Sequence, residues 1–256
     1  MTPKERVLGI DFFNGTCQAA CEQAEQGGLV LAPSGPGLAG DLTRSAIYRE
    51  AVQEADLVLA DSGLLCLWAK YLSGKKIQRV SGLLFLQNLL ERKKWVRSSS
   101  LWVMPDQKQS DANVRWMRKA YAGELSNCEV YISPMYPANG RIIDQDLLRK
   151  IEEVRPRYIF IQIGGGTQER LGLYLKKNLS FSPVILCTGA ALAFLSGQQV
   201  KIPRWADYFF LGWLLRCIYN PAVFVPRYLK AFKLIYLLLK YGEKSPVSVS
   251  SIPPSK

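Results

Sequence analysis

Short apolar runs alternate along the chain with longer segments of helical periodicity. In the strand-length runs nearly every residue is apolar, as in Leu57–Ala60 and Tyr158–Ile163. Continuous runs of this kind are typical of strands that are buried on both faces, as in parallel sheets. The predicted strands are Val7–Ile10, Leu29–Ala32, Leu57–Ala60, Ile77–Ser81, Leu101–Met104, Cys128–Ile132, Tyr158–Ile163 and Pro183–Cys187.

The segments between these strands predict helices. They extend to about Ala24, over Asp41–Glu54, from Ser62 onward, over Gly82–Arg92, Asn113–Ala122 and Asp144–Val154, and beyond Gly166. Strands that alternate with helices in this rhythm specify parallel βαβ units. The sequence therefore predicts an α/β fold, with a Rossmann-like parallel sheet and helices on both faces.

The last quarter of the chain differs from the rest. No strand is predicted after Ser196, and residues 197–256 contain nine Lys/Arg against two Asp/Glu. We therefore predict a core over residues 1–196 and a basic, aromatic helical appendage over residues 197–241. A tail over residues 242–256, rich in Ser, Pro and Val, is expected to be disordered.

Within the appendage, Pro226–Tyr241 predicts a basic amphipathic helix. One side carries Tyr228, Leu229, Phe232, Ile235, Tyr236 and Leu239. This composition is typical of a helix that lies in a membrane interface. A terminal helix packed on the domain or on a partner subunit explains it equally well, and the sequence leaves open whether the chain forms a homo-oligomer.

Other membrane and secretion signals are weak. The longest apolar stretch, Tyr208–Val225, is interrupted by Arg216, Asn220 and Pro221, so it is a poor candidate for a spanning helix. The N-terminus lacks the apolar core of a signal peptide. We expect a cytoplasmic protein that is at most peripherally bound to the membrane.

The composition excludes several kinds of chemistry. The 256 residues carry a net charge of +12 but include no histidine, which excludes an imidazole base and a histidine metal site. The six cysteines form no C-x-x-C pair and fall mostly in apolar segments, as expected of reduced thiols in the cytosol. Because the positive charge is concentrated beside an apolar helix, we expect no nucleic-acid partner.

Three positions are candidates for a functional site on the evidence of their residue types and positions alone. Asp61 follows a predicted central strand at the edge where α/β proteins bind ligands, although an Asp there also suits a helix N-cap. The glycines Gly164–Gly166 precede a helix whose amides suit a phosphate or carboxylate, but strand–helix turns also use glycine for steric reasons. Arg79, at a predicted strand end, suits either a diphosphate or a surface carboxylate.

Other motifs are absent or are better explained by structure. Neither G-x-G-x-x-G nor a Walker A sequence is present. Asp144 and Asp146 have the spacing of an Asp-x-Asp metal site, but first-turn acids of a helix are the better explanation. We therefore predict no metal and no cofactor.

Several segments, in order, resemble the WecG/TagA/CpsF glycosyltransferases. They are Ala55–Trp68, Arg79–Gly82, Tyr158–Glu169, Gly197–Trp205 and, in the appendage, Gly212–Tyr228. The resemblance covers the chain to about Tyr241. It implies a membrane-peripheral, metal-independent, inverting enzyme of cell-surface or exopolysaccharide assembly. Such enzymes transfer a sugar, N-acetylmannosamine in the best-known members, from UDP to a polyprenyl-diphosphate-linked sugar.

The resemblance also implies roles for individual residues. Asp61 matches the general base, Arg79 the diphosphate-binding arginine and Gln168 a donor-binding glutamine, with Glu169 beside it. Without a metal, charge on the leaving diphosphate would be stabilised by cations and helix N-termini. The cations are Arg79 and the appendage residues Arg216 and Arg227.

The chain departs from the family pattern at the expected donor and acceptor contacts. The Thr-x-Asn donor loop is Ala32-Pro33-Ser34, so Ser34 is the position where the donor sugar would be recognised. Other departures are Ser81–Leu84 for Thr-Gly-x-Asp, Gly166-Thr167 for Pro-Lys, Gly212 for Glu, and Val223 for an Arg. We expect an altered sugar or acceptor. The alternative is a non-catalytic scaffold that binds a lipid diphosphate or a partner transferase.

Overall fold

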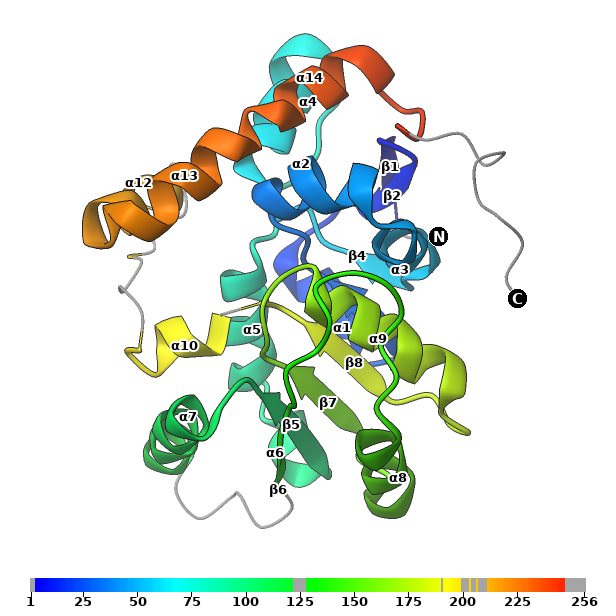
Figure 1. The fold of residues 1–256 in the computed structure, drawn as a ribbon, viewed down its shortest axis with the longest axis vertical. Helices are drawn as coiled ribbons and strands as arrows, with labels where there is room; N and C mark the ends of the chain where they lie inside the picture. Colours follow the sequence, from blue (N-terminus) through cyan, green and yellow to red (C-terminus); the bar gives the residue numbers. More distant parts are fainter. Residues whose placement is uncertain are drawn as a thin grey trace.

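A six-stranded parallel sheet forms the centre of the protein (Figure 1). The computed structural model describes residues 3–121, 128–189, 191–198, 203, 206 and 211–246. The strand order is β4-β3-β8-β7-β5-β6. The strands are β3 (Gly28–Leu31), β4 (Leu57–Val58), β5 (Ser100–Met104), β6 (Cys128–Ile132), β7 (Tyr158–Ile161) and β8 (Val184–Cys187). The predicted α/β fold is confirmed.

Helices cover both faces of this sheet. Successive residues of β7 enter opposite cores, with Ile159 and Ile161 on one side and Tyr158 and Phe160 on the other. The first core includes α3 (Ala46–Glu54), α8 (Gln145–Val154) and α9 (Thr167–Asn178). The second includes α1 (Cys17–Ala24), α5 (Gly82–Glu91), α6 (Lys94–Arg97), α7 (Gln107–Ala120) and α10 (Ala191–Leu195). Burial on both faces explains why the strands are apolar at every position.

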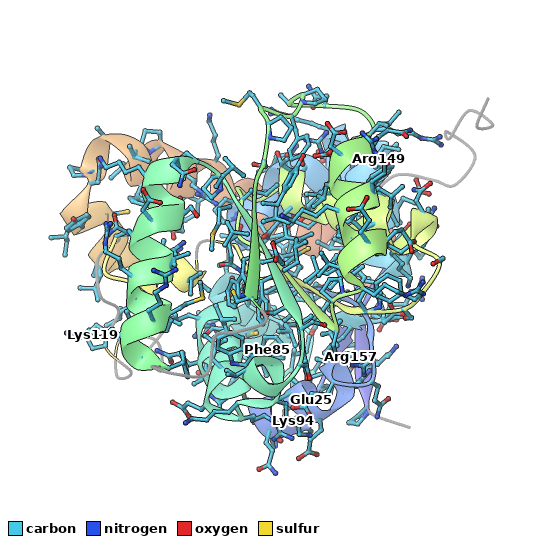
Figure 2. All side chains as sticks on the ribbon, turned by 90° about the horizontal axis from the view of Figure 1, so that it is seen from below. Glu25, Phe85, Lys94, Lys119, Arg149 and Arg157 are labelled. Carbon is cyan, nitrogen blue, oxygen red and sulfur yellow. The ribbon has the colours of Figure 1, made fainter. Side chains whose placement is uncertain are left out.

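Ion pairs close the edge of the sheet where the strands begin. The Glu25 carboxylate accepts hydrogen bonds from Arg92 Nε at 2.7 Å and Lys94 Nζ at 2.6 Å. Arg157 donates to the Glu25 carbonyl at 2.5 Å, and Figure 2 shows Glu25, Lys94 and Arg157 at this edge. In open α/β sheets ligands bind at the opposite edge, where the strands end.

The predicted strand Val7–Ile10 is wrong. The structure instead has an antiparallel hairpin, β1 (Lys4–Val7) and β2 (Ile10–Phe13), outside the main sheet. Leu8 and Gly9 form its turn with φ of 53° and 76°. Their amides donate to the carbonyls of Gly242 and Glu243 at 2.8 and 2.9 Å, so the end of the appendage is fastened to the hairpin.

Two further predictions are wrong near the site. The predicted helix Asp41–Glu54 is two helices, α2 (Gly35–Arg44) and α3, because Ser45 is extended and its Oγ caps Tyr48 N at 3.1 Å. The predicted strand Ile77–Ser81 is an irregular segment. There the Asn14 side chain hydrogen-bonds Lys76 O at 2.7 Å and Gln78 N at 2.9 Å, replacing bonds that a sheet neighbour would supply.

The appendage consists of three helices in the part of the chain that the structure describes. They are α12 (Gly212–Tyr219), α13 (Pro221–Ala231) and α14 (Lys233–Tyr241). The predicted helix Pro226–Tyr241 is thus divided at Phe232. Helix α13 packs on α2, and α14 packs on both α2 and α4 (Gly63–Leu72).

The two sides of α14 differ in environment. Leu234, Leu237 and Leu238 are buried against the core, which confirms that the helix packs on the domain. The predicted apolar side is the outer one, and Tyr236 and Leu239 on it are exposed. Among the described helices none has the length and apolarity needed to cross a membrane. Residues 199–202 and 204–205 of the resemblance, and residues 247–256 of the predicted tail, lie outside the described residues.

Candidate active site

The carboxyl ends of four adjacent strands bring the candidate residues to one edge of the sheet. Ser34 follows β3, Asp61 follows β4, Gly164 follows β7, and the Thr188–Gly189 turn follows β8. This is the edge at which open α/β sheets bind ligands. Asp61 follows a strand as predicted, but the prediction that this strand is central is wrong, since β4 is an edge strand of the sheet.

Asp61 connects the starts of two helices. Its Oδ1 accepts a hydrogen bond from Gly82 N, at the start of α5, at 3.0 Å. The cap of α4 is Ser62, whose Oγ accepts from Leu65 N at 3.3 Å, so the alternative that Asp61 caps the next helix is wrong. The N-terminus of α5 stabilises negative charge on the Asp61 carboxylate.

Arg79 reaches Asp61 from the irregular segment before α5. Its Nε donates to the Asp61 carbonyl at 3.0 Å, and the residue is half-buried. The Asn14 side chain hydrogen-bonds the same segment at Lys76 and Gln78, which lie three residues and one residue before Arg79. The Arg79 guanidinium is therefore fixed to the backbone of the residue that carries the candidate carboxylate.

Ser34 caps α2 next to the Asp61 loop. Its Oγ accepts from Gly37 N at 3.3 Å. A Cβ on the adjacent Gly35 would lie 3.0 Å from Ser62 Oγ, so the start of α2 lies against the start of α4. The donor loop expected at Ala32–Ser34 is therefore in contact with the loop that carries Asp61.

The Gly164–Gly166 turn leads β7 into α9. Gly164 and Gly165 are exposed, and Gly166 is the N-cap with φ of 85°. Glu169 Oε2 accepts from Gly166 N at 2.7 Å. The Glu169 carboxyl group therefore already occupies part of this helix N-terminus, and it is supplied by the chain itself.

Gln168 and Glu169 lie beneath this turn, each only 2% exposed. Gln168 Nε2 donates to Glu169 Oε1 at 3.1 Å, and Gly189 N donates to Gln168 Oε1 at 2.8 Å. Burial raises the pKa of Glu169, and hydrogen bonds from Gln168 and Gly166 oppose that rise. The two side chains brace the turns after β7 and β8, and donor contact by Gln168 stays a prediction.

Sequence reasoning did not identify two further polar residues at this edge, Asp41 and Tyr48. A Cβ on Gly166 would lie 2.9 Å from Asp41 Oδ2, and one on Gly37 would lie 3.2 Å from Tyr48 OH. Burial raises the pKa of both side chains. The Tyr48 hydroxyl is buried without a hydrogen-bond partner among the described residues. Asp41 lies two helical turns beyond Ser34, a spacing that could have indicated a shared face of α2.

The two appendage arginines differ in their surroundings. Arg227 is exposed on α13, and its positive charge is one of those that lower the pKa of Asp41 against the effect of burial. Arg216 Nη1 donates to Tyr228 OH at 3.1 Å, and its guanidinium lies 4.5 Å from the centre of the Phe194 ring. The charge of Arg227 therefore affects Asp41 at the sheet edge. Arg216 instead joins α12 to α13 and α10.

The Asp144–Asp146 motif is a helix start. Asp144 caps α8 by accepting from Leu147 N at 2.9 Å, and it also accepts from Tyr136 OH at 2.6 Å. Asp146 pairs with Arg149. Within the described ranges no three His, Cys, Asp or Glu side chains converge as a metal site would require. All six cysteines are free thiols.

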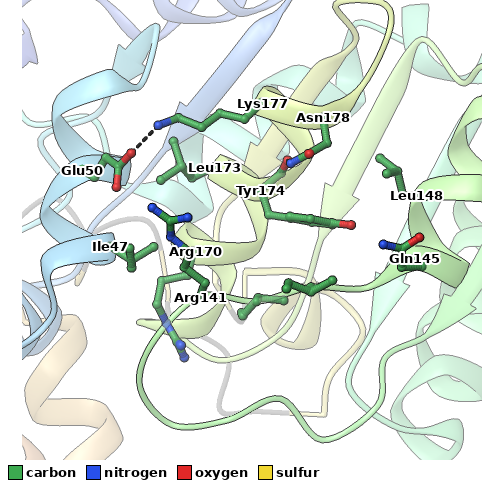
Figure 3. A pocket seen from close by; sticks show the side chains of 12 residues that line it. Ile47, Glu50, Arg141, Gln145, Leu148, Arg170, Leu173, Tyr174, Lys177 and Asn178 are labelled. Atoms are coloured by element: carbon green, nitrogen blue, oxygen red, sulfur yellow. Dashed lines mark hydrogen bonds and ion pairs between the residues drawn. The ribbon is translucent and has the colours of Figure 1, made fainter. Parts of the chain in front are cut away.

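A cavity of about 360 Å³ lies outside this cluster, between α3, α8, α9 and the loop before α8 (Figure 3). Arg170 forms part of its wall and donates to the carbonyls of Gly140 at 2.8 Å, Pro137 at 2.9 Å and Gly166 at 2.9 Å. Arg170 thereby ties the loop to the Gly166 turn. None of the predicted site residues lines this cavity.

Comparison with known protein families identifies a family for this chain. The model described as "Glycosyl transferase WecG/TagA/CpsF family" matches residues 5–246, nearly the whole chain. No individually curated protein sequence matches it.

Proposed function

Since the chain belongs to the WecG/TagA/CpsF family of glycosyltransferases, and its general activity is glycosyl transfer, we propose the following reaction. The protein transfers a sugar from a UDP donor to a polyprenyl-diphosphate-linked acceptor, with inversion and without a metal. The products serve cell-surface or exopolysaccharide assembly. The observation that carries the proposal is the contact between Asp61 and Arg79 at the carboxyl edge of the sheet.

In this reaction the Asp61 carboxylate removes the proton of the attacking acceptor hydroxyl. The hydroxyl oxygen forms a bond to the anomeric carbon as the bond from that carbon to the UDP oxygen breaks. A positioned base and electrostatic stabilisation of the leaving group are the two contributions that this displacement needs. Arg79 stabilises the charge that develops on the departing diphosphate.

The donor sugar lies, in this proposal, between Ser34 and the Gly164 turn. Support comes from the open space at Gly164, where no atom lies within 4 Å of the position that a Cβ would take, and from the contact between the Gly35 and Ser62 loops. N-acetylmannosamine or a related hexosamine or hexose fits the family. Gln168 braces this region from below, and a direct contact with the donor requires it to move.

In this proposal the enzyme lies on the cytoplasmic face of the membrane, and the appendage contacts the lipid. Its outer side carries Trp213, Ile218, Leu229 and Phe232, which are 48%, 70%, 60% and 62% exposed. Residues 211–242 contain five Lys/Arg and no Asp or Glu. Apolar residues set among cations favour a surface of anionic lipid, at about 1 kcal/mol for each cation near it.

The second candidate is a non-catalytic scaffold for a lipid diphosphate or a partner transferase. It is favoured by the burial of Gln168 and Glu169, whose side chains hydrogen-bond within the protein. A scaffold should bind vesicles but transfer no sugar.

Purified protein, vesicles containing a polyprenyl-diphosphate sugar, and a panel of UDP-sugars test the proposal. One donor should be consumed with release of UDP, and the same donor should raise the Tm. A ligand at 100 times its dissociation constant stabilises by about 2.7 kcal/mol. Neither transfer nor a Tm shift with any donor would reject the enzyme.

A further inference from the structure

Helix α4 of the core ends in apolar side chains that face solvent. Leu67, Tyr71 and Leu72 are 37%, 69% and 66% exposed. On its inner side Leu65 and Ala69 are buried in the core. The helix is thus already packed, and its outer apolar residues are not needed to hold it in place.

Helix α14 lies beside α4 at one end of the molecule (Figure 1). Its outer residues Tyr236 and Leu239 are 55% and 63% exposed, and the preceding Phe232 is 62% exposed. We call the exposed apolar residues of these two neighbouring helices the α4–α14 face. It consists of Leu67, Tyr71, Leu72, Phe232, Tyr236 and Leu239. Monomeric soluble proteins rarely expose apolar side chains in such a group without a partner.

The charged side chains of the two helices themselves have one sign. Helix α4 carries Lys70 and α14 carries Lys233 and Lys240, and neither helix contains an Asp or Glu. Just beyond α14, Glu243 is paired with Lys75 at 2.5 Å. Lys70 Nζ lies 4.9 Å from the centre of the Tyr71 ring, and Lys240 Nζ lies 5.4 Å from that of Tyr236. Tyrosine rings beside lysines are typical of the level of lipid headgroups.

The charges also decide which partner fits. A second copy of the chain would bring the same lysines against one another, which disfavours self-association. An anionic lipid surface offers the opposite charge together with an apolar interior. We propose that α4 binds an anionic membrane together with α14, so that a helix of the core contacts the lipid as well as the appendage.

This inference rests on the proposed function and adds an orientation to it. Helix α4 begins at Gly63, two residues after Asp61, and has 10 residues. At 1.5 Å per residue its length is about 15 Å. The two residues from Gly63 back to Asp61 add up to about 7 Å. Binding through the last turn of α4 therefore holds Asp61 within about 22 Å of the lipid headgroups, the level at which the acceptor diphosphate would lie.

Sedimentation of the full chain with vesicles tests the inference. Vesicles are made of phosphatidylcholine alone or with phosphatidylglycerol. The double variant Tyr71→Ser/Leu72→Ser should lower the partition coefficient on the anionic vesicles about tenfold or more. The reason is that the variant lacks the apolar surface that two large side chains would transfer from water into the lipid. The matched control is Met135→Ser/Ile143→Ser, which removes two side chains that are 99% and 70% exposed elsewhere. It should change partitioning less than twofold.

Three results would overturn the inference. The first is unchanged vesicle binding by the α4 variant, or an equal loss in the control. The second is equal binding of the native protein to both kinds of vesicle. The third is a fall in oligomer size for the α4 variant, in sedimentation without lipid, while vesicle binding persists. Binding of UDP-sugars to the protein without vesicles is measured separately, so failure there rejects the proposed function and leaves the vesicle result standing.

Discussion

Replacing Gly166 by alanine should destabilise the turn between β7 and α9. Gly166 has φ of 85°, which side-chain-bearing residues rarely adopt, and strain of this kind costs about 1–3 kcal/mol. The new Cβ would also lie 2.9 Å from Asp41 Oδ2. Because that oxygen is the end of a flexible side chain, it can move, and the backbone strain should dominate. We expect the free energy of unfolding to fall by about 1–3 kcal/mol.

Gly164→Ala is the matched control two residues earlier. No atom lies within 4 Å of a Cβ there, and the backbone is outside the left-handed region. Alanine should therefore leave stability unchanged or raise it by up to about 1 kcal/mol, through a less flexible unfolded chain. Unfolding in guanidinium chloride measures both variants. For a chain of this length each kcal/mol corresponds to a Tm shift of about 2–4 °C.

A double-mutant cycle separates the strain from the contact with Asp41. If strain dominates, Asp41→Ala and Gly166→Ala should add to within about 0.5 kcal/mol. A native-like Gly166→Ala variant, or an equal loss in Gly164→Ala, would refute the reasoning about this turn.

Three further predictions concern the same edge of the sheet. Arg79→Lys keeps the charge but loses the guanidinium fork, so kcat/KM for sugar transfer should fall about 10²–10³-fold, and native-like kinetics would exclude a role for Arg79 with the diphosphate. Asn14→Ala removes two hydrogen bonds to the Arg79 segment. It should lower the free energy of unfolding by about 1–3 kcal/mol and lower kcat/KM. The control Asn139→Ala, on an exposed loop, should change neither quantity. Burial raises the pKa of Glu169 above its ordinary 4.5, so its contribution to stability is complete below that pH and declines as pH rises toward the raised folded-state pKa. Glu169→Gln should flatten this part of the stability–pH curve, and an unchanged slope in guanidinium unfolding from pH 4.5 upward would contradict the assignment.

The parallel sheet could be predicted because burial on both faces leaves a direct trace in the sequence. The runs at Tyr158–Ile161 and Val184–Cys187 are apolar at every position, and both are fully enclosed. A strand was also predicted at Ile77–Ser81, where only Ile77 and Val80 are apolar and buried, but the segment is irregular and belongs to neither sheet. There the Asn14 side chain supplies the backbone hydrogen bonds, and its position 62 residues away from Lys76 leaves no local signal.

The pattern of apolar residues could not predict where some helices and strands end. Periodicity continues across Ser45, but its extended backbone and capping Oγ separate α2 from α3. At Leu8–Gly9 the positive φ angles turn the chain inside a run that has the composition of one strand. In both cases a local backbone conformation decides the structure, and the hydrophobic pattern does not encode it.

The candidate site was predictable in position more than in detail. Asp61 and Arg79 came from strand placement and from the family resemblance, and they do meet. The internal hydrogen bonds of Gln168 and Glu169, and the approach of Asp41 to Gly166, depend on how α2, α9 and the β8 turn pack together. Such contacts join residues that are distant in sequence, so no local pattern reports them.

The exchange Asp61→Asn tests the central claim most directly. Asparagine can still accept the hydrogen bond from Gly82 N, so the fold and the α5 contact should persist while the base is lost. Transfer from the UDP-sugar to the polyprenyl-diphosphate acceptor is measured in vesicles, with Asp111→Asn, on the exposed side of α7, as the control. The account predicts a loss of about 10²–10⁴-fold in kcat/KM for Asp61→Asn, with an unchanged Tm and UDP-sugar affinity, and native activity for the control. Transfer by Asp61→Asn at close to the native rate would contradict it.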